Sequence, residues 1–168
     1  MKLHEEIHRP VPYASIQQEA LANLLRVGDQ LDNRLSRFFR EHGLTLSRYN
    51  VLRSLSLADQ PLTCGEIGER MIQVVPAITS LVDQLEKQGL VERERCTDDR
   101  RVVHVHITKQ GRKLVDDALA LLPALENTLL SKLTQKEMKS LVGLLERVRE
   151  SLAVCDENLP QVLNSSFL

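Results

Sequence analysis

Aromatic residues are scarce in this sequence. It has no tryptophan, three phenylalanines and two tyrosines, which together make up 3% of its 168 residues. A core stacked mainly from aromatic rings is therefore excluded. Because 42% of the residues are hydrophobic, we still expect a core, built mainly from leucine, valine and isoleucine in one domain with or without extensions.

Long apolar runs are also missing. No stretch of about 18 consecutive apolar residues occurs, which excludes a transmembrane helix and a membrane partner. The start, MKLHEEIHRP, is charged and no apolar stretch follows it, so we expect no signal peptide. The cysteines, Cys64, Cys96 and Cys155, are odd in number and far apart. This pattern predicts reduced thiols in a cytoplasmic protein and disfavours a disulfide framework.

Charge is distributed unevenly although the formal net charge is only −1. Between Lys87 and Lys113, eight basic and four acidic residues leave a surplus of +4, so the rest of the chain sums to −5. A local basic surface is what binding to a nucleic acid requires. A solvated charged hairpin without a partner explains the same charges equally well.

The first part of the chain is predicted to be helical after a short arm. Residues 1–14 contain two prolines and are expected to form an extended arm. Ser15 is suited to cap the helix that follows, and leucines at helical spacing continue to about residue 42. A second helix comes next, so 15–58 is predicted to supply helices for dimerisation and support.

The central segment, 59–107, has the pattern of a helix-turn-helix followed by a two-stranded wing. Thr63 and Glu66 have the spacing of a capping box, which begins a short helix. Pro76 suits the first position of the next helix, and Gly89 ends it. LVERER and RVVHVHIT then alternate as two strands around the turn CTDD.

The last part, 108–155, is predicted to form two dimerisation helices, the first bent near Pro123, before a flexible tail at 156–168. Apolar residues at spacings of three and four form a coiled-coil-like seam in the second helix: Met138, Leu141, Leu145, Val148 and Leu152. The terminal helices have more apolar face than one small domain covers, which favours a symmetric homodimer. The predicted fold class is mainly α with a small β-wing.

The segment LTCGEIGERM, followed by VPAITSLVDQLEKQGLVERERCTDDRRVVHVHITKQGRKL, resembles the DNA-binding lobe of the MarR family of bacterial transcription regulators. The blocks LVDQLEKQGLVER, DRR and ITKQG carry the resemblance, and the upstream GLTLSRYNVLRSL is similar to the family's second helix. The resemblance extends over residues 15–152. It implies a ligand-responsive repressor that acts as a homodimer on an inverted repeat in double-stranded DNA.

A helix can read the major groove when the side chains of its first turns face the base edges. In the helix 76–88 the apolar residues are predicted to face the core, which leaves Thr79, Ser80 and Asp83 facing outward. Gln73 and Val75 lie where the chain enters this helix, and with Thr79 and Ser80 they are the candidates for DNA contact. Thr79 and Ser80 can hydrogen-bond to base edges or phosphates. Many family members have arginine at the position of Ser80, so this chain has few side chains for strong guanine contacts.

The wing tip carries two arginines, which suit a minor groove because its negative potential attracts guanidinium groups. By the resemblance, Arg101 reaches into that groove. Asp99 is expected to orient the tip by pairing with a neighbouring arginine. Arg100, Arg95 and Lys87 are interpreted as phosphate contacts.

Family members commonly bind small aromatic or phenolic anions between the dimerisation and DNA-binding lobes. The resemblance therefore implies a possible effector pocket with five lining residues: Phe38, Phe39, His42, Tyr49 and Arg53. The alternative for Phe38 and Tyr49 is that they fill the core. No permanent cofactor is expected.

Four other classes of function can be compared with these residues: a metal-binding regulator, a thiol sensor, a protein-contact module and an enzyme. His104 and His106 share one strand face and Cys96 is near in sequence, but no further ligands at fixed spacing complete a metal site. Cys64 follows an N-cap, where a thiol can become reactive, although peroxide-sensing members of the family place their cysteine near the start of the first long helix. A winged helix used only for protein contacts remains possible. No catalytic motif occurs, so we expect no enzyme.

Overall fold

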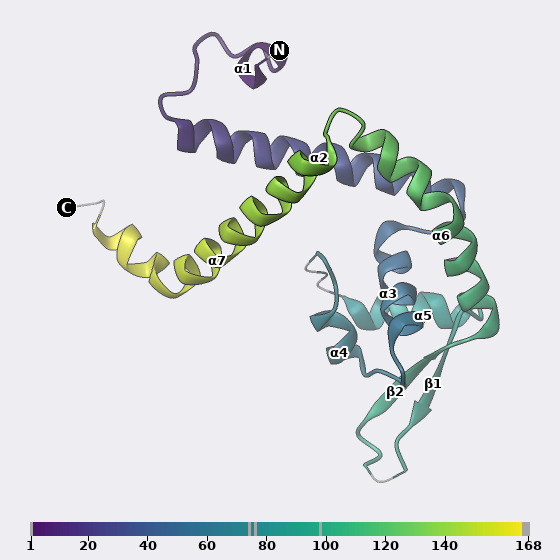
Figure 1. Cartoon of the computed structure of the whole chain (residues 1–168). Coiled ribbons are helices and arrows are strands. Elements are labelled where there is room, and N and C mark those ends of the chain that lie inside the picture. The colour runs from purple at the N-terminus through teal and green to yellow at the C-terminus, as the bar shows by residue number, and fades with distance from the viewer. Residues whose placement is uncertain (1, 74, 76, 98, 166–168) are drawn as a thin grey trace. The chain divides into compact units, whose positions relative to one another are not determined.

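The computed structural model describes residues 2–73, 75, 77–97 and 99–165 (Figure 1). Its helices and strands are, in chain order, α1 (Leu3–Glu6), α2 (Ile16–Glu41), α3 (Leu46–Leu57), α4 (Cys64–Glu69), α5 (Ile78–Lys87), β1 (Val91–Arg95), β2 (Val103–Ile107), α6 (Lys109–Leu129) and α7 (Gln135–Ser165). The chain divides into two compact units, residues 1–120 and 121–168. This mostly helical fold with one antiparallel two-stranded sheet confirms the predicted fold class.

The predicted capping box begins α4. The Thr63 hydroxyl accepts a hydrogen bond from the Glu66 N–H at 3.3 Å, and Glu66 Oε2 accepts one from the Thr63 N–H at 2.7 Å. That backbone hydrogen bond also lowers the pKa of the Glu66 carboxyl. The start of α5 has no such box, since its N-cap, Ala77, offers no side-chain acceptor, and Pro76 lies outside the described residues.

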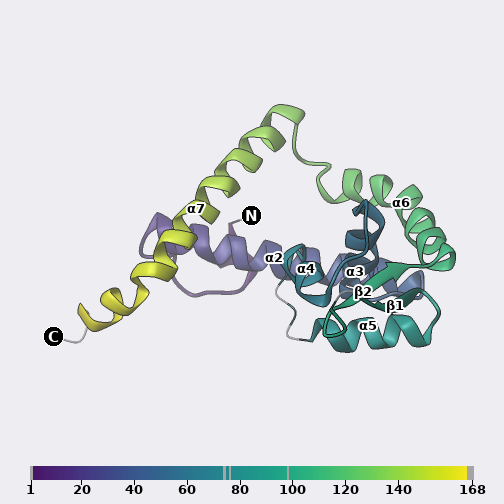
Figure 2. The same cartoon turned by 90° about the horizontal axis from the view of Figure 1, so that it is seen from below.

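The core of the first unit joins the helix-turn-helix to the wing. Its least exposed side chains come from α3, α4, α5, β2 and the start of α6 and are each 0% exposed: Val51, Leu52, Ile67, Val82, Leu85, Val105 and Val115. The strands pair from Val91 opposite Ile107 to Arg95 opposite Val103. Figures 1 and 2 show α3, α4 and α5 grouped at the base of the hairpin. Together α4, α5 and the hairpin form a winged helix-turn-helix.

The N-terminal arm is not extended throughout, so the prediction for 1–14 is wrong at residues 3–6, which form α1. Its Leu3 side chain is buried, with 6% exposed. Glu6 accepts hydrogen bonds from Arg26 at 3.1 Å and from Gln30 at 3.2 Å, both on α2. These contacts with α2 hold a helical turn that is too short to be stable by itself.

The second unit contains the end of α6 and all of α7. Thr134 and Glu137 form a capping box at the start of α7, with the Glu137 carboxylate 2.8 Å from the Thr134 N–H. Pro123 lies inside α6, which the structure shows as one helix from Lys109 to Leu129. The helical backbone of α7 continues to Ser165, beyond the boundary predicted at residue 155. None of the described helices combines the length and apolarity needed to cross a membrane.

Candidate DNA-binding surface

Thr79 and Ser80 lie on α5 as the apolar pattern predicted. Val82 and Leu85 are fully buried, and Thr79 and Ser80 are exposed. The two hydroxyl side chains thus lie in the first turn of the helix, where a major groove is read. Val75 is half-buried just before the helix.

Gln73 is exposed but already has a partner. Its side-chain Nε2 donates a hydrogen bond to Asp32 Oδ1 on α2 at 2.9 Å. The segment that enters α5 is therefore tied to the long N-terminal helix. Only a DNA contact through this particular N–H of Gln73 would require the hydrogen bond to open, because the amide has a second N–H and a carbonyl oxygen.

Arg48 is a basic residue near α5 that the sequence interpretation did not select. It lies on α3, whose N-cap is Thr45, and its guanidinium donates to the side-chain carbonyl of Gln84 on α5. This contact supports the brace that α3 provides for α5. The sequence contains no local signal for it, because 36 residues separate the two partners.

The wing tip is held by backbone hydrogen bonds around Asp99. The Arg101 N–H donates to Asp99 Oδ1 at 2.9 Å, and the Val102 N–H donates to the Asp99 carbonyl at 2.9 Å. Asp99 forms no ion pair with an arginine side chain among the described residues, so the predicted pairing is wrong, and its role in orienting the tip stays a prediction. A carboxylate that accepts a backbone N–H two residues later forms a local Asx-turn, which leaves the guanidinium groups outward.

The other basic candidates lie around this lobe. Arg100 and Arg101 are exposed at the tip, Arg95 is exposed at the end of β1, and Lys87 is exposed in the last turn of α5. Within the described part of the chain, none of these four side chains is engaged in an ion pair or hydrogen bond. They are therefore available to phosphates.

Four of the five proposed effector-pocket residues form a cluster of rings: Phe38, Phe39, His42 and Tyr49. Phe39 and Tyr49 are buried, with 1% and 6% exposed, and their rings stack at 4.1 Å. Phe38 contacts Phe39 edge to face at 5.1 Å, and its carbonyl lies 2.8 Å from His42 Nδ1. The buried pair fills the core between α2 and α3, whereas Phe38, His42 and Arg53 stay half-buried.

The histidine and cysteine alternatives find little support in the geometry. His106 Nε2 lies 3.1 Å from Glu94 Oε2 on the neighbouring strand, but no group of three or more possible ligands that could hold a metal occurs among the described residues. Cys64 and Cys96 are half-buried free thiols, and Cys155 is exposed.

Comparison with known proteins agrees with this winged helix-turn-helix. The sequence profile of the MarR family matches residues 44–103. The chain is 30% identical over 126 residues to the HTH-type transcriptional regulator MhqR of Bacillus subtilis strain 168, an alignment that covers 74% of this chain and 86% of MhqR.

Solved structures have the same fold. A mutant of Escherichia coli MarR in complex with operator DNA matches with a TM-score of 0.69 and 26% identity, over 88% of this chain and 99% of that chain. AbsC, a MarR family transcriptional regulator from Streptomyces coelicolor, matches with a TM-score of 0.74 and 20% identity, over 85% of this chain and 99% of that chain. These similarities confirm the resemblance seen in the sequence, and the chain belongs to the MarR family of transcriptional regulators.

Proposed function

We propose that this chain binds an inverted-repeat operator in double-stranded DNA as a homodimer and represses transcription from it. One observation carries the proposal: α5 and the wing belong to one lobe and end in exposed groups suited to two different grooves. Thr79 and Ser80 face outward on α5, and Arg100 and Arg101 are exposed at the tip. The related E. coli MarR mutant was crystallised with operator DNA.

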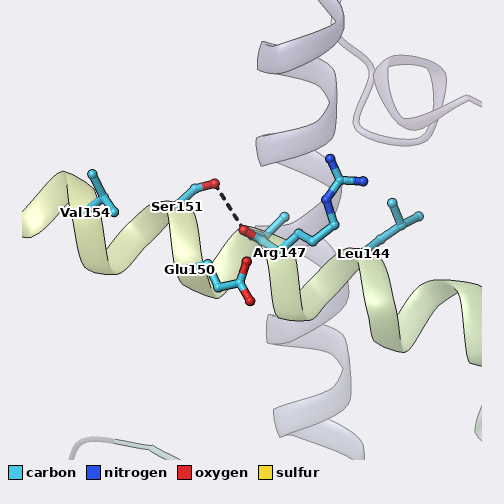
Figure 3. Close-up of a pocket in the computed structure, with 6 residues that line it drawn as sticks. Leu144, Arg147, Glu150, Ser151 and Val154 are labelled. Carbon is cyan, nitrogen blue, oxygen red and sulfur yellow. Dashed lines mark hydrogen bonds between the residues drawn. The ribbon is translucent and has the colours of Figure 1, made fainter.

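The dimer would use the apolar faces of the terminal helices. On α7 the predicted seam residues Leu141, Leu145 and Leu152 are 38%, 36% and 55% exposed. A groove of about 670 Å³ also lies along this helix (Figure 3), lined by Leu144, Arg147, Val148, Glu150, Ser151 and Val154. Large exposed apolar faces of this kind favour self-association.

A homodimer would place two recognition helices about one DNA turn apart, roughly 34 Å. Repression would then follow from exclusion of RNA polymerase, in the cytoplasm where the DNA lies. An aromatic or phenolic effector would relieve repression only if it binds one dimer conformation more tightly than the other. The favoured conformation must be the one in which the spacing of the recognition helices does not fit DNA. Moving that equilibrium from about 1:99 to 99:1 requires about 5.5 kcal/mol of preference. No enzymatic activity is proposed.

The test is a gel shift of the purified protein on the DNA upstream of its own gene, across a salt series. Six to ten phosphate contacts would lower the affinity by about three to five decades between about 50 and 200 mM salt. If no duplex shifts at low salt, the DNA-binding function is wrong and a winged helix used for protein contacts takes its place.

Replacing Arg101 by alanine is expected to weaken operator binding by about 1–3 kcal/mol, or roughly 5- to 150-fold. The reason is the loss of a guanidinium from the negative potential of a minor groove. The measurement is a titration of labelled operator by fluorescence anisotropy. Arg37→Ala is the matched control, because Arg37 is 80% exposed on α2, outside the winged lobe. Equal affinities of both variants and the unmodified protein would remove the wing tip from the interface.

A further inference from the structure

Arg93 is the one basic residue of the wing strands whose side chain turns back onto the recognition helix in the described structure. Along β1, alternate side chains lie on the same face, and Val91, two residues earlier, is 1% exposed. Arg93 follows Val91 on that inner face, and its side chain is only 23% exposed. Figure 2 shows β1 and α5 close to one another, and the two elements are in contact.

Three groups on α5 accept hydrogen bonds from the Arg93 guanidinium. It donates to the Asp83 carboxylate, to Glu86 Oε2 at 3.2 Å and to the Thr79 carbonyl at 3.2 Å. The acceptors are spaced by four and three residues, so they form one stripe along the helix. Burial works to lower the pKa of Arg93, but the hydrogen bond and charge of Asp83, together with Glu86, raise it overall. The arginine is therefore charged and fixed along α5.

This contact has two consequences for a DNA-binding lobe. Its single positive charge offsets one of the two negative charges that Asp83 and Glu86 place on the recognition helix, where both would otherwise repel phosphates. It also joins α5 to the strand that leads to the wing tip, so the orientation of the tip follows that of α5. Hydrogen bonds between a guanidinium and carboxylates are stronger than hydrogen bonds between neutral groups, and the planar arrangement of the guanidinium N–H donors fixes their direction.

We propose that Arg93 is a positioning residue for operator binding: it holds the wing against α5, so that the wing-tip arginines and the first turn of α5 reach neighbouring grooves of one duplex. The inference rests on the proposed function. Arg93 itself does not contact DNA, because its guanidinium is occupied by α5.

The sign of one mutational effect separates positioning from simple electrostatics. Replacing Asp83 and Glu86 together by alanine removes two negative charges from the DNA-facing helix. Charge alone would then strengthen binding to DNA. If Arg93 positions the wing, the same double variant loses the acceptors of Arg93 and binds the operator about 10-fold more weakly or worse.

Salt dependence separates positioning from a phosphate contact. We expect Arg93→Met to weaken operator binding about 10- to 100-fold and to leave the slope of log affinity against log salt unchanged. Arg95→Met is the matched control on the same strand. As a phosphate contact, Arg95 should lower the steepness of that slope by about 0.9 when lost. Arg93→Lys keeps the positive charge but loses the planar set of guanidinium N–H donors. It should therefore bind the operator more tightly than Arg93→Met and less tightly than the unmodified protein.

These titrations use the full-length protein, with thermal unfolding measured in parallel. If Arg93→Met fails to fold, the Asp83/Glu86 double variant, which keeps Arg93, decides the question. The inference is overturned if that double variant binds the operator as tightly as the unmodified protein or more tightly, or if Arg93→Met flattens the salt slope as Arg95→Met does. A failure of the proposed function differs from both outcomes, since the unmodified protein would then bind no duplex.

Discussion

Replacing Leu145 by glutamate is expected to split the homodimer and to lower operator affinity by about two to four decades. Leu145 lies in the middle of the predicted seam on α7 and is 36% exposed in the single chain. In a symmetric interface each substitution occurs twice, so two carboxylates would be brought together in an apolar contact. Burying unpaired charges is costly, and dissociation avoids that cost.

The affinity falls because the two DNA-binding lobes are no longer joined to one another. In a dimer the second lobe binds at the high effective concentration set by the first, whereas a monomer binds each half-site alone. Sedimentation equilibrium would report the oligomeric state, and an operator titration would report the affinity. Lys139→Gln is the control, because Lys139 is exposed on α7 away from the seam and its loss changes the net charge by the same unit. A Leu145→Glu protein that remains dimeric and binds normally would place the interface elsewhere.

The winged lobe could be predicted from the sequence because its signals are local and agree with one another. The Thr63–Glu66 capping box marks the start of α4, and Gly89, with a φ of 69°, follows the end of α5. The alternation of apolar and polar residues predicted the two strands on either side of the turn. Local signals of this kind do not depend on tertiary packing, so the lobe's elements were placed to within a few residues.

One failed prediction is explained by a contact between distant residues, and the other by a local backbone hydrogen bond. The prolines of the arm favoured extended backbone, but Leu3 is buried, and Glu6 contacts Arg26 on α2 across 20 residues. Asp99 was expected to choose an arginine side chain. The backbone N–H of Arg101 lies only two residues away. A hydrogen bond to it costs less conformational entropy than an ion pair, which would fix a long arginine side chain.

The positioning role of Arg93 illustrates the same limit in the candidate site. Alternation from the buried Val91 predicts that Arg93 faces inward, so the sequence did contain a signal that it differs from Arg100 and Arg101. What the inward face would meet depends on the packing of β1 against α5. The three acceptors on α5 therefore became visible only in the structure, and the sequence interpretation placed Asp83 simply outward.

Replacing Gly111 by alanine is expected to destabilise the protein by about 1–3 kcal/mol, as overpacking of a close contact does. Gly111 is buried near the start of α6. A Cβ at this position would lie 2.2 Å from the Leu90 carbonyl oxygen and 3.0 Å from Ile107 Cγ1. The first distance is far below van der Waals contact, so the backbone of one segment must move.

Neither segment can move freely, because hydrogen bonds join the two. The Leu90 carbonyl accepts from the Thr108 N–H at 3.1 Å, and the Thr108 hydroxyl donates to the Gly89 carbonyl at 2.8 Å. The same hydroxyl accepts the Gly111 N–H at 3.1 Å. Separating α6 from the turn that precedes β1 would strain these bonds and shift the base of the wing.

The measurement is urea unfolding of the unmodified protein and of Gly111→Ala, with the operator affinity of the folded variant as a second readout. Gly65→Ala is the matched control, since a Cβ on α4 would meet only Thr63 Oγ1, at an ordinary 3.9 Å. That variant should unfold at the same or a slightly higher urea concentration, because alanine is the better helix former. An unchanged unfolding free energy for Gly111→Ala would mean that α6 can move away from the Leu90 carbonyl without loss of stability. In that case the close approach at this glycine does not fix the wing.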